Sequence, residues 1–385
     1  MGLNLYAAHD QWANRPADER FWTLEEMLGA CKGYAEHART ASVKLDGVRC
    51  EDREGSRVLV GREDRPAHFT HWSFGQLASR VQAPAGYLRT LPAPLAADCI
   101  NNGLSTIKGE ESTILLHSNG SLVCRAFTSE DYSRIWNWEI AQRLMSLPQQ
   151  GWQVPPARPA MANQSGARPA TEEDILERRA GLSVKVGDLI APAGLYASDH
   201  DMFAFMVNEQ IRIEDGTEGG LARGFFVSNS EVGAAAFKIT KFLYKFVCGN
   251  HIVWDAKEVK EIRIVHRGSA DRRYAGQLVA ELWKYARESS AGDEQRIEAA
   301  RRFEIGSNKD EVLDRLFGIK SLGIPWKTLD AAYEHVVRHP ERYKASPRSA
   351  YGMANGLTAI SQETNYADDR TSLDRAAGRV LSMAF

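Results

Sequence analysis

The stretch from residue 224 to residue 268 carries the clearest pattern of hydrophobic and polar positions in the chain. A short apolar run leads to Ser228 and Glu231, which stand three residues apart, as in a helix-capping box. Apolar residues then recur at helical spacing up to Gly249, where a left-handed C-cap is favourable. The pattern predicts a strand, a helix that starts near residue 229 or 230, a tight turn and two further strands.

Three lysines lie within this predicted helix at intervals of three and four residues. A helix would place Lys238, Lys241 and Lys245 on one face, because residues with this spacing are neighbours on a helical surface. The apolar residues of the same stretch would face a core. The prediction is therefore a capped basic helix with one packed side and one cationic side.

Upstream of this stretch, the pattern predicts an N-terminal α+β region at 1–148. Thr23 and Glu26 have capping-box spacing at the start of an expected helix. Asn119 and Gly120 lie between two apolar runs and predict a β-hairpin. The other expected elements are a helix over 23–38, strands at 43–50 and 57–61, two or three helices within 72–104, and a helix over 137–147.

Residues 149–170 mark a change of composition, because they are rich in proline, alanine and glycine and contain no acidic residue. We interpret them as an exposed linker or a long loop. A β-rich core with the capped basic helix is expected at 171–268, and a helical region without heptads at 269–385. The predicted fold class is α+β, with small antiparallel sheets and packed helices followed by a helical C-terminal region.

Composition and charge indicate a soluble globular protein but do not identify its ligand. With 43% hydrophobic and 25% charged residues, the chain resembles ordinary soluble globular proteins. Its net charge of −2 means that a nucleic-acid-binding face would have to gather basic residues locally. The five cysteines form no CxxC pair and indicate reduced thiols. Because no signal peptide or membrane span is visible in the sequence, we expect a cytoplasmic protein without membrane contact.

Sequence motifs of common enzymes are absent, including the phosphate-binding loop, the HExxH zinc motif, the calcium loop and the nucleophile elbow. His68 and His71 have the spacing of metal ligands, but no third ligand lies near them in the sequence. His335 and His339 fit a helix end, where they would complement the helix dipole.

The tripeptide Asp199-His200-Asp201 sets a histidine between two carboxylates, which could orient it as a base. On a strand, however, His200 would point away from both carboxylates. We therefore interpret the tripeptide as a turn or a strand-edge feature. No catalytic residue, metal site or cofactor is predicted.

The stretch from residue 238 to residue 284 concentrates positive charge, with ten lysines and arginines against five acidic residues. Aromatic residues are interleaved with them. Cations that neutralise phosphates and rings that stack on bases are the requirements for sequence-tolerant binding of single strands. The candidate nucleic-acid contacts here are Lys238, Lys241, Lys245, Arg263, Arg267 and Trp254.

A second candidate cluster is RAFTSEDYSRIWNW, at 125–138. Arginines beside aromatic rings would suit a binding edge if they are exposed, and core packing if they are buried. The sequence leaves both interpretations open. The residues concerned are Arg125, Tyr132, Arg134 and Trp136.

Six motifs together resemble one known family. They are NSEVG at 229–233, LYKFVCGNHIVW at 243–254, IRIVHRG at 262–268, and stretches within 125–137, 194–205 and 350–381. The chain resembles phage- and plasmid-borne proteins catalogued as a domain of unknown function and often called phage/plasmid-like protein. The resemblance spans about 69–381 and implies a mobile genetic element as the context, without an established activity.

These features favour a non-enzymatic protein that binds single-stranded DNA for annealing or protection in replication or recombination. The annealing step rests on analogy with proteins that hold DNA in a basic groove on an oligomeric ring without ATP. A homo-oligomer is then expected. The alternative is a protein–protein interaction module that acts on host defence or on the element's own regulation. A third hypothesis is a metal-dependent nuclease or hydrolase that uses Asp199, His200 and Asp201.

Overall fold

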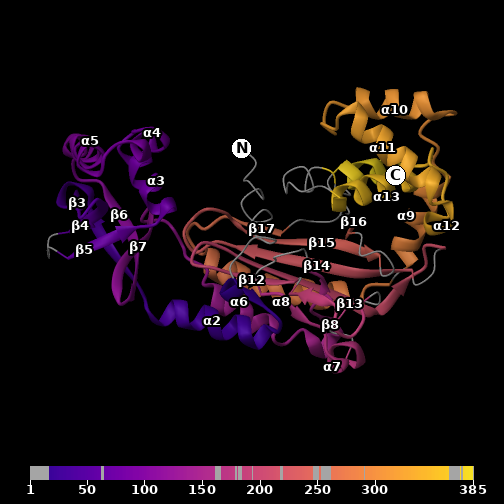
Figure 1. Cartoon of the computed structure of the whole chain (residues 1–385), viewed down its shortest axis with the longest axis horizontal. Coiled ribbons are helices and arrows are strands. Elements are labelled where there is room, and N and C mark those ends of the chain that lie inside the picture. Colours follow the sequence, from indigo (N-terminus) through magenta and orange to yellow (C-terminus); the bar gives the residue numbers. More distant parts are fainter. Residues whose placement is uncertain are drawn as a thin grey trace.

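Three parts follow one another along the molecule: a small sheet with helices, a large central sheet, and a group of C-terminal helices (Figure 1). The computed structural model describes residues 17–61, 65–160, 166–177, 180, 184–192, 194–216, 220–245, 251–252, 262–289, 291–363, 373 and 376–384.

The N-terminal sheet has six strands in the order β2-β6-β7-β5-β4-β3. β5 runs parallel to β7, and the other neighbours are antiparallel. Helices α3 to α5 pack on one face of this sheet, around Phe74, Leu77 and Ile100. The predicted hairpin is confirmed, since β6 and β7 join at Gly120. The bounds are β2 (Ala38–Lys44), β3 (Arg49–Arg53), β4 (Ser56–Val60), β5 (Pro66–Phe69), α3 (His71–Arg80), α4 (Ala85–Thr90), α5 (Ala93–Thr106), β6 (Glu111–Asn119) and β7 (Ser121–Thr128).

The central sheet has eight strands, of which six follow the order β1-β12-β13-β14-β15-β16, while β8 pairs with β13 and β17 with β15. Its pairings are antiparallel. Both faces are apolar, because Phe225 and Val227 belong to one core whereas Ala222 belongs to another. The bounds are β1 (Arg20–Phe21), β8 (Trp152–Gln153), β12 (Leu195–Ala197), β13 (Met202–Ile213), β14 (Leu221–Asn229), β15 (Phe237–Lys245), β16 (His251–Ile252) and β17 (Ile262–Ile264).

Three helices cover one face of the central sheet: α2 (Leu24–Glu36), α6 (Asn137–Leu144) and α8 (Ala270–Arg287) (Figure 1). The predicted cap of α2 is confirmed, since Thr23 Oγ1 accepts a hydrogen bond from the Glu26 amide at 3.1 Å. The packing differs from a single N-terminal region at 1–148, because α2 and α6 share the core of the central sheet. The small N-terminal sheet is therefore an excursion of the chain between α2 and α6.

The C-terminal part is helical, as predicted, and its core includes Ile213, Leu221 and Leu243 from the end of the central sheet. Together with the sheets, this confirms the α+β fold class. Among the described helices, none has the length and apolar character needed to cross a membrane. The bounds are α9 (Ala291–Arg302), α10 (Lys309–Gly318), α11 (Trp326–Arg338), α12 (Pro340–Tyr343) and α13 (Ala350–Glu363).

The predicted basic helix is wrong, because Phe237–Lys245 forms strand β15. Phe237 and Ile239 face the core under α8, while Phe242 faces the opposite core. A strand that is apolar on both faces lacks alternation, so a short run of this kind can resemble a helical stripe. Pairing with β14 on one side and β17 on the other satisfies its backbone groups.

The exposed-linker interpretation of 149–170 is also corrected for its described residues. Trp152 is buried beneath the central sheet, and β8 pairs with β13. Two short strands, β9 (Arg158–Pro159) and β10 (Arg168–Pro169), flank β11 (Leu189–Ala191) in a separate three-stranded sheet. Proline is compatible with these positions, because β9 and β10 form the edges of that small sheet.

Candidate functional site

A β-bulge in the N-terminal sheet places Arg125 at the boundary with the central sheet. Leu115 pairs with Ala126 and Leu116 pairs with Cys124, so Arg125 is the extra residue of β7. A bulge of this kind re-aims a side chain, and here Arg125 reaches the turn before β13 and the loop after β14.

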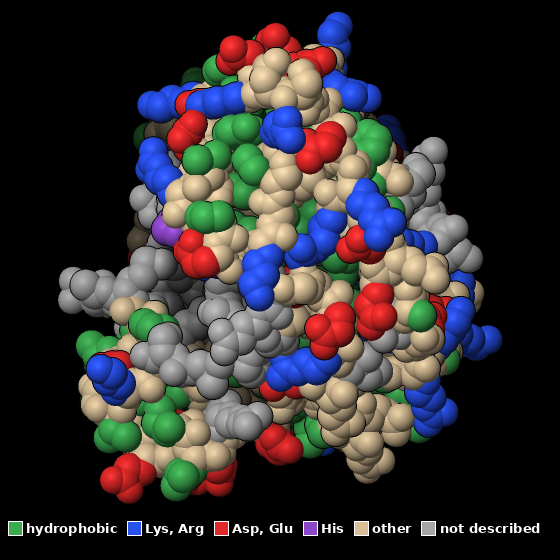
Figure 2. All heavy atoms as spheres, turned by 90° about the vertical axis from the view of Figure 1, so that its right-hand side faces the viewer, with side chains coloured by type: hydrophobic (Ala, Val, Ile, Leu, Met, Phe, Trp, Pro, Cys, Tyr) green, Lys and Arg blue, Asp and Glu red, His purple; other side chains and the backbone are tan. Residues whose placement is uncertain are grey.

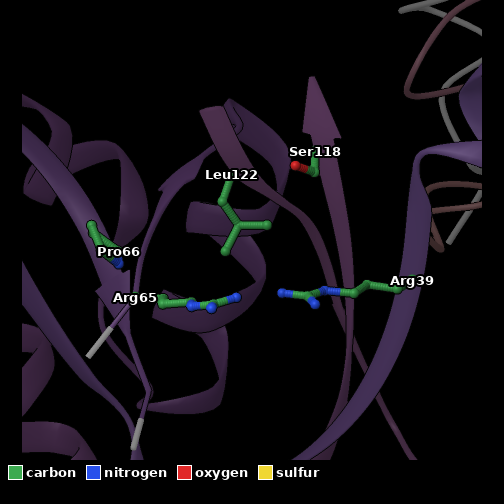
Figure 3. A pocket seen from close by; sticks show the side chains of 5 residues that line it. All are labelled: Arg39, Arg65, Pro66, Ser118 and Leu122. Carbon is green, nitrogen blue, oxygen red and sulfur yellow. The ribbon is translucent and has the colours of Figure 1, made fainter. Parts of the chain in front are cut away.

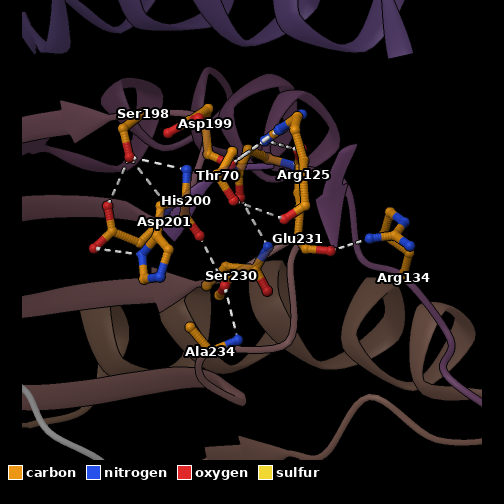
Figure 4. Close-up of polar contacts among 12 residues, drawn as sticks. Thr70, Arg125, Arg134, Ser198, Asp199, His200, Asp201, Ser230, Glu231 and Ala234 are labelled. Carbon is orange, nitrogen blue, oxygen red and sulfur yellow. Dashed lines mark hydrogen bonds and ion pairs between the residues drawn. The ribbon is translucent and has the colours of Figure 1, made fainter. Parts of the chain in front are cut away.

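The guanidinium of Arg125 is buried and bonds to both loops through its Nε and Nη2 (Figure 4). Its Nε donates to the Asp199 carbonyl at 3.1 Å, and its Nη2 donates to the same carbonyl. Nη2 also forms an ion pair with Glu231 Oε2 at 3.2 Å, in which the two side chains are only 2% and 1% exposed. Because water does not reach this pair, each charge is compensated mainly by the other.

Glu231 connects the same loop to the start of α6. Its Oε1 accepts a hydrogen bond from the Asn137 amide at 2.8 Å, and its backbone carbonyl accepts one from Arg134. The side-chain Nδ2 of Asn229 donates a hydrogen bond to Asn137 Oδ1 at 2.8 Å. We call Arg125, Arg134, Asn137, Asn229 and Glu231 the junction network, because they join both sheets and α6.

The tripeptide Asp199-His200-Asp201 lies in the turn between β12 and β13, which agrees with the turn interpretation. Asp201 Oδ1 accepts a hydrogen bond from Ser198 Oγ at 3.0 Å, which tightens the turn. The carbonyl of His200 accepts one from Ser230 Oγ at 2.7 Å (Figure 4). The tripeptide thus docks the turn on the junction network.

Tyr132 and His266 form a stacked ring pair at this boundary. Their rings are nearly parallel, with centroids 5.0 Å apart, and Tyr132 Oη donates to the Ser230 carbonyl at 2.9 Å. Burial lowers the pKa of His266 to about 4, although the carbonyl of Ser133 opposes this shift from 3.1 Å away. Burial raises the pKa of Tyr132. Both rings are therefore neutral at physiological pH, and each covers one face of the other.

The 125–138 cluster therefore belongs to packing rather than to an open binding edge. Arg134 lies over the rings of both Tyr132 and Trp136, at 5.2 and 5.7 Å, and Trp136 packs beside Val232. Burial lowers the pKa of Arg134, which still remains a cation because guanidinium loses its proton only at very high pH. Chemically, the network supplies charge pairing and hydrogen bonds, without a nucleophile beside a base.

The three lysines of the predicted helix do not share one face. Lys238 and Lys241 point to opposite faces of β15, since side chains alternate along a strand. Lys241 Nζ lies 3.8 Å from the Glu281 carboxylate and 4.7 Å from the Tyr285 ring centroid, against α8. The side chain of Lys245 and the whole of Trp254 lie outside the described residues.

An exposed group of arginines remains next to the junction network. Arg263 lies on β17, Arg267 lies just after it, and Arg272 and Arg273 lie in the first turn of α8. The backbone at 266–268 is anchored to 131–133, where Tyr132 and Arg267 form an antiparallel bridge. We call Arg263, Arg267, Arg272 and Arg273 the arginine patch; Asp271 is the acidic residue among them.

Sequence reasoning selected Arg263 and Arg267 but missed two features of this region. Arg272 and Arg273 entered the count of basic residues without being proposed as contacts, although they lie in the first turn of α8. Glu231 was taken for a capping residue, whereas it is the centre of the junction network. The NSEVG motif was the available signal, since it holds both Asn229 and Glu231.

The described residues contain no group of three potential ligands that could hold a metal ion. His71 lies at the start of α3 and His68 within β5, both on the surface. His335 and His339 lie at the C-terminal end of α11, as predicted, with ring centroids 4.9 Å apart.

A match to a known protein family falls on the part of the chain that carries this site. No curated protein and no solved structure matches the chain. Residues 173–308 match a family described as Domain of unknown function (DUF932), and this segment includes Glu231, most of the central sheet and the whole arginine patch.

Proposed function

We propose that this protein binds nucleic acid, with single-stranded DNA as the principal ligand, in the replication or recombination of a phage or plasmid. The observation that carries the proposal is the arginine patch. Its four side chains are exposed within eleven residues of chain, and one acidic residue, Asp271, lies among them. Guanidinium groups clustered in this way can contact successive phosphates.

The proposed binding mode is phosphate recognition without base stacking from the 125–138 cluster. Tyr132 is stacked on His266, and Trp136 is packed beneath Arg134, so each ring already has one face covered. Binding of this kind is tolerant of sequence, because phosphates carry no base information. It also weakens steeply with salt.

Charge elsewhere on the surface supports a localised site. On the face formed by the C-terminal helices and the adjoining end of the sheet, basic and acidic side chains are interspersed (Figure 2). Such a mixed surface does not attract a polyanion, and the net charge of the chain is −2. The arginine patch differs from that face by its excess of one sign.

A triple variant tests the patch. Arg263→Gln, Arg267→Gln and Arg272→Gln together should weaken binding of a labelled single strand by about tenfold or more and reduce the salt slope by about 2. The matched control is Lys320→Gln, Lys327→Gln and Arg338→Gln, which removes three exposed cations from the C-terminal helical part. Equal binding by the two folded variants would refute the arginine patch as the site.

Annealing requires two strands to be brought together, so we extend the proposal to a homo-oligomer. Light scattering on the purified chain, with and without a single strand, measures the assembly. A monomer under both conditions would remove annealing from the proposal while leaving single-strand binding in place.

One observation favours a second candidate, a protein–protein interaction module. Leu176, Val186 and Leu189 are 82%, 58% and 51% exposed around the small three-stranded sheet, and exposed Glu172 and Asp188 lie beside them. Lys185 is also exposed beside Val186, so the acidic residues are in excess around these apolar side chains, which fits a partner whose own apolar surface has a basic rim. This candidate predicts a partner that is lost on Leu176→Asp and retained in the arginine-patch variant.

A further inference from the structure

A separate pocket opens on the N-terminal sheet, away from the junction network. Its volume is about 360 Å³, and it lies at the hairpin end of the sheet (Figure 3). We call it the arginine pocket; it is lined by Arg39, Arg65, Pro66, Ser118 and Leu122.

The strand register explains why these residues converge. Ser118 pairs with Leu122 beside the β6–β7 turn, and Arg39 of β2 pairs with Leu116 of β6. On the other side of β7, Pro66 begins β5, which pairs with β7 from Val123 onward. The lining side chains thus come from one end of four neighbouring strands, beside the core that helices α3 to α5 form with the sheet.

Two cations face one another across this pocket. Figure 3 shows the guanidinium groups of Arg39 and Arg65 directed toward each other from opposite walls. Both arginines are exposed, and the described residues that line the pocket include no carboxylate. Guanidinium stays charged at all physiological pH values, so the two groups repel each other unless an anion lies between them.

We infer that the arginine pocket binds the phosphate group of a nucleotide. Two arginines can hold a phosphate through paired N–H donors, which Lys could not reproduce with the same geometry. The hydroxyl of Ser118 offers a further hydrogen-bond donor on the same wall. The volume lies within the range of small-molecule sites, and Leu122 with Pro66 provides apolar surface for the attached sugar and base.

This inference stands independently of the proposed function. The nucleotide could be a free molecule or one unit of a bound strand, since both present the same phosphate to the two arginines. The arginine patch lies on β17, the segment after it and α8, whereas the arginine pocket lies on the N-terminal sheet, so variants of each can be made separately.

The test uses the full chain and isothermal titration calorimetry with three probes: deoxyadenosine monophosphate, deoxyadenosine without phosphate, and a single-stranded oligonucleotide. The pocket variant is Arg39→Gln with Arg65→Gln. The control is Lys327→Gln with Arg338→Gln, which removes the same charge from exposed positions on α11. Circular dichroism confirms that both variants are folded.

We expect the pocket variant to bind a phosphorylated probe at least tenfold more weakly, with no such loss in the control and no comparable binding of deoxyadenosine. A loss seen with the mononucleotide identifies a free nucleotide as sufficient, and a loss seen only with the oligonucleotide identifies a strand. If neither phosphorylated probe distinguishes the pocket variant from the control, the inference is overturned. If the pocket variant loses mononucleotide binding while no strand binds the protein, the proposed function fails and the pocket stands.

Discussion

The ion pair between Arg125 and Glu231 joins two side chains that lie 106 residues apart in the chain. Each charge is shielded from water, so its stability depends on the other. The pairing lets two charged side chains stay buried although their sequence neighbours, Ala126 and Val232, belong to an apolar core.

Arg125→Ala should lower the free energy of unfolding by about 3–5 kcal/mol, because it leaves the Glu231 carboxylate buried without a cation. Urea denaturation measures this change. The double variant with Glu231→Gln should be less destabilised than the sum of the two single variants. Additive effects, or a loss no larger than that of Arg302→Ala on the surface, would contradict the pairing.

His266 should make folding stability depend on pH. Its folded pKa of about 4 lies below the ordinary value of 6.5, so the native state favours the neutral ring. Stability is then fully present above pH 6.5 and falls as pH drops toward 4, by about 3 kcal/mol in total. Denaturation curves across this range should be flatter for His266→Asn. Parallel curves for the two proteins would exclude this role for His266.

At the scale of elements, the sequence predicted helix caps and turns correctly where the structure depends on one short segment. The Thr23 cap and the Asn119-Gly120 turn are such segments, because their hydrogen bonds form within a few residues. β15 was mistaken for a helix because both of its faces are apolar, so its sequence lacks the alternation of a half-buried strand. Its two apolar faces become intelligible only once both cores are known.

Gly224 shows how closely these strands pack. A Cβ atom at this position would lie 2.1 Å from Cε2 of Phe242, which is buried opposite it on β15. Gly224→Ala should therefore destabilise the protein by about 1–3 kcal/mol through overpacking.

The matched control is Gly276→Ala on the exposed side of α8, where the added carbon meets nothing within 4 Å apart from its chain neighbours and the backbone of its own helix. This change should stabilise by about 0.5–1 kcal/mol, since alanine favours a helix. Thermal or urea unfolding of both variants measures the difference. Equal stability of the two variants would show that Phe242 yields without cost.

At the scale of the whole molecule, the fold class followed from the sequence, whereas the arrangement of the parts did not. The chain contributes β1 and α2 to the central sheet, leaves to build the N-terminal sheet, and returns at α6. No local sequence pattern predicts this path of the chain, because it depends on contacts between residues more than a hundred positions apart. The same reason concealed the ion pair between Arg125 and Glu231, whereas Arg263 and Arg267 were selected as candidate contacts from charge alone.

The most direct test of nucleic-acid binding is fluorescence anisotropy of a labelled oligonucleotide, single-stranded and duplex, at about 50 mM and about 200 mM salt. We predict a preference for the single strand and an affinity that falls about 50-fold between the two salt concentrations, as expected for four arginine–phosphate contacts. Absence of binding to either oligonucleotide at the lower salt concentration would contradict the proposed function and leave the protein-interaction module as the remaining candidate.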